Sequence, residues 1–194
     1  ESQGIWVVAG EAKSGQGAML YTLDRAAATA RDLQALAKEV ELDRIDKVAC
    51  AGGACVFIGV KGSSSKQVVR FDGATLVNIT STFALNTPGA WTVYSGGDSI
   101  ALAGVFKDPT VGVREPFTIR VYRLRGGSWQ KITSDELLQS AQEPKVDLNF
   151  TGTHWILARR GSGAGFPFRM WTIDDTRFSE ITSKFASILS RFTF

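Results

Sequence analysis

The side chains best suited to bind a ligand in this sequence are cations that lie in segments rich in glycine and serine. Four such segments, residues 11–17, 61–66, 107–116 and 159–167, each follow a run of apolar residues. Together they contain Lys13, Lys61, Lys66, Lys107, Arg114, Arg159 and Arg160. Loops carry binding residues more often than the strands that they connect. Gathered on one face, these cations would attract an anionic glycan or an acidic protein surface, although acidic residues among them leave an ordinary solvated surface as the alternative.

Residues for catalysis or metal binding are scarce. His154 is the only histidine, and no motif places it beside a serine or cysteine nucleophile. Residues 161–165 are rich in glycine but lack the Gly-Lys-Ser/Thr ending of a phosphate-binding loop. Two cysteines and one histidine supply too few ligands for a closed structural zinc site. We therefore expect no metal, no cofactor and no catalysis, with a carbohydrate-active enzyme that uses carboxylates in a channel as the alternative.

The two cysteines flank a short segment, Ala51-Gly52-Gly53-Ala54. A two-residue hairpin turn at the glycines would pair the alanines and place Cys50 opposite Cys55. Side chains in that register lie close enough for a disulfide, and two buried thiols are the alternative. Because disulfides persist in oxidising compartments, we expect an extracellular or cell-surface protein, with the periplasm as a further setting.

A sequence repeat organises the elements that hold these residues. Ile-Thr-Ser occurs at residues 79–81, 132–134 and 181–183, and a degenerate fourth copy fits residues 30–32. Each copy follows strand-like apolar runs separated by turn residues, which predicts four antiparallel strands per unit. The Thr-Ser pair is a good helix N-cap, so a short helical connection should follow each unit. Apolar residues at helical spacing predict the longest of these helices within residues 26–43.

The unit resembles the blade of a β-propeller, in which four antiparallel strands recur about every 50 residues. The resemblance implies an all-β protein of about four four-stranded blades. We expect a single domain or propeller fragment over residues 1–194, with repeats at residues 1–43, 44–87, 88–144 and 145–194. The first unit lacks its first strand, and the C-terminal residues 190–194 could supply it and close the ring. A piece of a larger propeller and a β-sandwich are the alternatives.

Propellers host enzymes, lectins and scaffolds alike, so the resemblance implies no single function. No apolar run reaches the roughly 18 residues of a membrane-spanning helix. The net charge of +3 is too small to predict nucleic-acid binding. We expect a non-catalytic binding or scaffolding module for a protein or an anionic polysaccharide, with a structural segment of an extracellular assembly as a further alternative. The specific ligand and the oligomeric state do not follow from the sequence.

Three further residues are candidates for a surface role. Trp129 begins the last strand of the third unit, where it could stack on a sugar or pack in the core. Asn78 and Asn149 begin N-glycosylation sequons, a pattern that also arises by chance.

Overall fold

The protein is described by a computed structural model. The description covers residues 5–11, 18–24, 27–62, 65–83, 91–107, 117–132, 139–140, 144–160, 168–174 and 177–184. Four antiparallel sheets make up nearly all of this part, and each sheet is built from one continuous stretch of chain.

The strands pair in chain order within every sheet. The first sheet contains β1 (Ile5–Glu11), β2 (Ala18–Asp24) and β3 (Thr29–Asp32), and α1 (Gln34–Glu39) follows it. The second contains β4 (Arg44–Ala51), β5 (Ala54–Lys61), β6 (Ser65–Phe71) and β7 (Leu76–Asn78), followed by the 3-10 helix η1 (Thr80–Phe83). The third contains β8 (Trp91–Gly96), β9 (Ser99–Lys107), β10 (Phe117–Arg125) and β11 (Ser128–Lys131), and β12 (Gln139–Ser140) also pairs with β10. The fourth contains β13 (Lys145–Phe150), β14 (Trp155–Arg160), β15 (Arg169–Ile173) and β16 (Phe178–Glu180).

The hairpin between β4 and β5 shows how turn residues set the register of a sheet. Gly52 and Gly53 both have positive φ, +56° and +80°, as a two-residue turn with the right twist requires. Cys50 therefore pairs with Cys55, as the sequence predicted, and a disulfide joins them.

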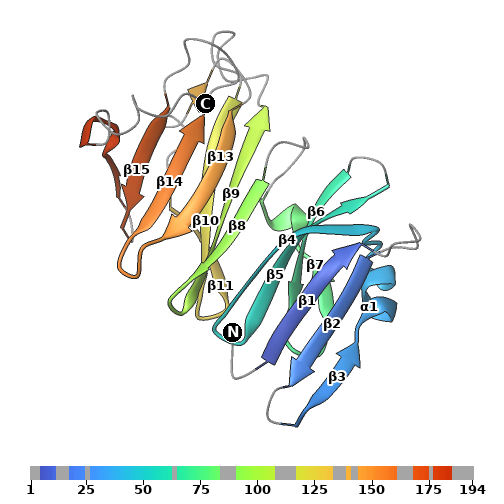
Figure 1. Ribbon diagram of the computed structural model, residues 1–194. Coiled ribbons are helices and arrows are strands. Elements are labelled where there is room, and N and C mark those ends of the chain that lie inside the picture. Colours follow the sequence, from blue (N-terminus) through green and yellow to red (C-terminus); the bar gives the residue numbers. More distant parts are fainter. Residues whose placement is uncertain are drawn as a thin grey trace.

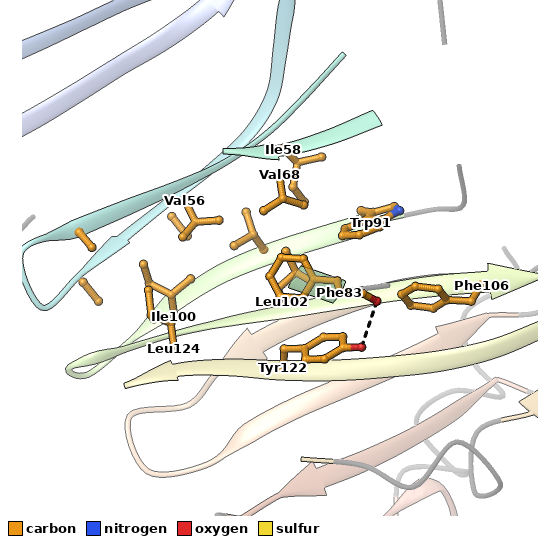
Figure 2. Close-up of a cluster of buried hydrophobic side chains, with 14 residues drawn as sticks. Val56, Ile58, Val68, Phe83, Trp91, Ile100, Leu102, Phe106, Tyr122 and Leu124 are labelled. Carbon is orange, nitrogen blue, oxygen red and sulfur yellow. Dashed lines mark hydrogen bonds between the residues drawn. The ribbon is translucent and has the colours of Figure 1, made fainter. Parts of the chain in front are cut away.

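The core consists of three clusters of apolar side chains, each between two consecutive sheets. In the cluster between the second and third sheets, Val56 and Ile58 of β5 face Ile100 and Leu102 of β9 (Figure 2). The four sheets thus form a row in which the first and fourth lie at opposite ends (Figure 1). The strand expected to close the ring, residues 190–194, lies outside the described residues, and closure stays a prediction.

The repeated Ile-Thr-Ser joins the end of the last strand to the third strand of the same sheet. The amide nitrogens of Ile79 and Ile181 donate to the carbonyls of Val68 and Met170, at 2.8 and 2.9 Å. The next residue adds its hydroxyl: Thr80 Oγ1 accepts from the amide of Val68 at 2.9 Å, and Thr182 Oγ1 accepts from that of Met170 at 3.0 Å. These hydroxyls bind a strand, whereas the sequence analysis predicted that they cap a helix.

In the first sheet the residue equivalent to these isoleucines is Leu33, whose amide donates to the carbonyl of Leu20 at 2.8 Å. The fourth copy predicted at residues 30–32 is therefore three residues out of register. The predicted helix within residues 26–43 is confirmed as α1, which buries Ala37 in the cluster between the first and second sheets.

Replacing Thr80 or Thr182 by valine should lower the free energy of unfolding by about 1–3 kcal/mol. Valine keeps the shape of threonine but leaves the amide of Val68 or Met170 without its hydroxyl acceptor. Urea unfolding would measure the loss. Ser81→Ala and Ser183→Ala, at exposed neighbouring positions, are the controls and should change stability by less than about 0.5 kcal/mol. Equal effects in the two pairs would contradict the role given to the hydroxyls.

Candidate binding site

Every sheet has two different ends. At the loop end the second strand of a unit ends and the third begins, and the described predicted cations Lys61, Lys66, Arg159 and Arg160 lie there. At the opposite turn end lie tight turns such as Gly52-Gly53 and Gly97-Asp98. Lys13, Arg114 and the side chain of Lys107 lie outside the described residues.

The two predicted lysines of the second sheet are paired with carboxylates at the loop end. Lys61 Nζ contacts Glu41, and Lys66 Nζ lies 2.6 Å from Asp46 Oδ2. Arg44 Nε lies 2.7 Å from the other oxygen of Asp46. Partial burial tends to raise the pKa of Asp46, but the hydrogen bonds and charges of Arg44 and Lys66 outweigh it and hold that pKa below its ordinary value. Much of the positive charge predicted here is therefore neutralised.

The predicted cations of the fourth sheet have different surroundings. Arg159 is 9% exposed, and its guanidinium lies 5.8 Å from the centre of the Trp171 ring. Arg160, the next residue along β14, is exposed. The third sheet separates these arginines from Lys61 and Lys66, so the described cations do not form one patch, and their binding role stays a prediction.

Trp129 takes the packing role that the sequence left open. Its ring is partly buried and meets the ring of Phe83 edge-on, with 5.0 Å between the centroids. Phe83 in turn packs 4.9 Å from Tyr122 (Figure 2).

The ion pairs of Asp46 predict an acid-dependent contribution to stability. Because its pKa is lowered by folding, the contribution is present above the unfolded value near pH 4 and is lost as the pH falls through the folded value. Asp46→Asn should cost less than about 1 kcal/mol at pH 7, as expected of a partly exposed pair, and the cost should shrink as the pH falls below about 4. Urea unfolding across this pH range would test it, with exposed Glu39→Gln as the control. A difference that grows on acidification would contradict the assignment.

A pocket of about 370 Å³ opens at the turn end between the third and fourth sheets. The third sheet contributes the β8–β9 turn, Gly96 to Ser99, and two side chains of β10, Arg123 and Arg125. The fourth sheet contributes Phe150, Thr153, Trp155, Ile173 and Asp174. The pocket is therefore shared by turns and strand ends that are distant in the sequence.

The base of the pocket is apolar, and its side chains are closely packed. Trp155 and Ile173 pair across β14 and β15, and they are 3% and 2% exposed. The ring of Phe150 lies 5.0 Å from that of Trp155 and packs directly on the backbone of Gly96. A Cβ at Gly96 would lie 2.3 Å from Cγ of Phe150, so only glycine permits this approach. Ser99 Oγ, which donates to the carbonyl of Gly96 at 3.1 Å, holds the turn in place.

The rim of the pocket carries charges of both signs. Arg125 Nε lies 3.7 Å from Asp98 Oδ2, and His154 Nε2 lies 3.8 Å from Asp174 Oδ1. All four side chains are more than half exposed. The other ring nitrogen of His154 lies 2.8 Å from Thr153 Oγ1. Such a rim offers hydrogen-bond donors and acceptors above an aromatic base, which is the usual chemistry of a small-molecule pocket.

Sequence reasoning missed this pocket. Asp72 and Asp174 occupy similar positions in the sequence, each directly after the third strand of its sheet. Asp72 does hold its turn: its carboxylate accepts from the amides of Thr75 and Ala74 at 2.9 and 3.0 Å, which lowers its pKa. Asp174 instead faces the pocket. No local signal separates the two, because the difference depends on which turn of the neighbouring sheet lies opposite.

Gly96→Ala should destabilise the protein by about 1–3 kcal/mol, since the new methyl group overlaps the Phe150 ring and forces the third and fourth sheets apart. Gly10→Ala is the matched control, because Gly10 also lies in a strand but has open space where a Cβ would stand. Urea unfolding of both variants would measure the difference. A neutral Gly96→Ala substitution would mean that the contact between Phe150 and Gly96 is looser than described.

No protein-family model matches the sequence, and no curated protein is similar to it in sequence. Solved structures are similar in fold. One is the β-propeller domain of the Trilobed protease from Pyrococcus furiosus, described as having an open velcro topology; it matches with a TM-score of 0.58 and 9% identity, over 93% of this chain and 54% of that one. Another, a prolyl endopeptidase, matches with a TM-score of 0.57 and 12% identity, over 93% of this chain and 28% of that one.

The sheets and these matches together show that the chain has a β-propeller fold, as its repeat predicted. Among the described residues the first sheet has three strands, β1, β2 and β3. The chain spans about half of the first matched chain and less of the second. At these identities the likeness concerns the fold alone.

Two further findings apply to the part of the chain that the structure describes. It holds no helix that is both long and apolar enough to cross a membrane. It also brings together no group of three His, Cys, Asp or Glu side chains that could hold a metal ion.

Proposed function

We propose that this chain is a non-catalytic binding module that recognises a protein or glycan partner at the turn end of its third and fourth sheets. The observation that carries the proposal is the pocket itself. Its base, Trp155 and Ile173, belongs to the core between two sheets, so the fold itself forms the floor of the pocket. Its rim, including Arg125 and Asp174, is exposed to solvent and able to form hydrogen bonds.

The loop end is the second candidate surface, and an anionic polysaccharide or an acidic protein is the partner that its cations would attract. Two of the described cations, Lys61 and Lys66, already contact carboxylates, which weakens their attraction for an anion. This pairing is the reason to favour the turn end.

An extracellular or cell-surface setting belongs to the same proposal, and the Cys50–Cys55 disulfide supports it because such bonds persist in oxidising compartments. A scaffolding role in an extracellular assembly would use the same surfaces.

Binding to glycan and peptide arrays would test the proposal with two double variants. Arg125→Ala with Asp174→Ala removes charges from the pocket rim, and Lys61→Ala with Arg160→Ala removes them from the loop end. We expect the first variant to lose at least about 10-fold in affinity, a loss of about 1.4 kcal/mol, and the second to bind like the native chain.

The reverse pattern would assign binding to the loop end and contradict the choice of surface. Cleavage of an array ligand by the native chain would contradict the non-catalytic role. If the native chain binds neither glycans nor peptides, the proposal fails as a whole.

A further inference from the structure

We infer that the ligand of the turn-end pocket is a neutral saccharide. This inference rests on the proposed function and adds the chemical class of the ligand. It starts from the balance of charge around the pocket: Arg123 and Arg125 bring two positive charges, and Asp98 and Asp174 bring two negative ones. Their attractions for an ionic ligand largely cancel, so a neutral ligand with many hydrogen-bonding groups fits the pocket better than a strongly charged one.

Two pairs of polar side chains at or beside the rim lie near each other without a direct hydrogen bond. The Arg125–Asp98 and His154–Asp174 distances, 3.7 and 3.8 Å, exceed the length of a normal hydrogen bond. A hydroxyl group beside Arg125 and Asp98 can accept from the guanidinium and donate to the carboxylate through one oxygen atom. A peptide group separates its donor from its acceptor and cannot do both at one point. Sugars carry several such hydroxyls, so one sugar residue offers a group of this kind to more than one polar side chain of the pocket.

The apolar base supplies the second half of saccharide recognition. Phe150 is partly exposed beside the buried indole of Trp155, so C–H groups of a sugar ring would meet aromatic carbon below the polar rim. A volume of about 370 Å³ lies near the lower limit for ligand pockets and suits a small ligand such as the end of an oligosaccharide.

The test uses immobilised oligosaccharides with neutral terminal sugars, their uronic-acid and sulfated counterparts, and a peptide array, all at about 0.05 and about 0.5 M salt. We expect neutral oligosaccharides to bind, with affinities that hardly change with salt, because no net charge is screened. Asp98→Asn and Asp174→Asn each remove a charged acceptor, and each should weaken that binding about 10-fold. Glu39→Gln, on α1 of the first sheet, is the matched control and should bind normally.

Binding restricted to acidic glycans or to peptides, and lost in the two pocket variants, would overturn the inference and leave the proposed function standing. Neutral-sugar binding that the two pocket variants do not weaken would overturn the inference and the choice of the turn end together. Binding to none of the probes would overturn the proposed function.

Discussion

Each antiparallel sheet in this chain has apolar side chains that leave water only when the next sheet packs on them. This constraint explains why one kind of interface occurs three times along the chain. Phe83 shows how a connection takes part in it. It follows the last strand of the second sheet, yet its ring packs against Tyr122 of the third sheet (Figure 2). The ring of Trp129, also of the third sheet, meets it edge-on. The connection thus links two sheets by packing as well as by the chain.

Hydrogen bonds between side chains add to this packing where the first strands of successive sheets meet. Lys47 Nζ on β4 donates to Thr92 Oγ1 on β8 at 2.8 Å, and that hydroxyl lies 3.4 Å from Asp147 Oδ1 on β13. Thr92 is 2% exposed, so its hydroxyl needs such partners. Through Thr92, the side chains of Lys47 and Asp147 thus connect three successive sheets.

The fold could be predicted from the sequence because its signals are local and repeated. The glycines at 52 and 53 predicted the turn and the cysteine pairing, and the Ile-Thr-Ser copies predicted where three sheets end. The prediction failed where the signal was weak: Leu33 lacks the threonine that marks its equivalents, and the first sheet was placed three residues out of register. The pocket could not be predicted at all, because Asp98, Arg125 and Phe150 come together only when two sheets pack side by side.

The position of the pocket follows from differences between otherwise equivalent turns. Between the second and third sheets the turn end is closed: a Cβ at Gly52 would lie 3.2 Å from the carbonyl oxygen of Asp98, and Arg70 Nη1 donates to the carbonyl of Gly127 at 3.4 Å. Between the third and fourth sheets the corresponding hairpin connection is longer, residues 151–154 instead of two residues. Arg123, the equivalent of Arg70, lines an opening there. The longer turn thus accompanies an open pocket at this interface, whereas the shorter turns between the second and third sheets contact each other.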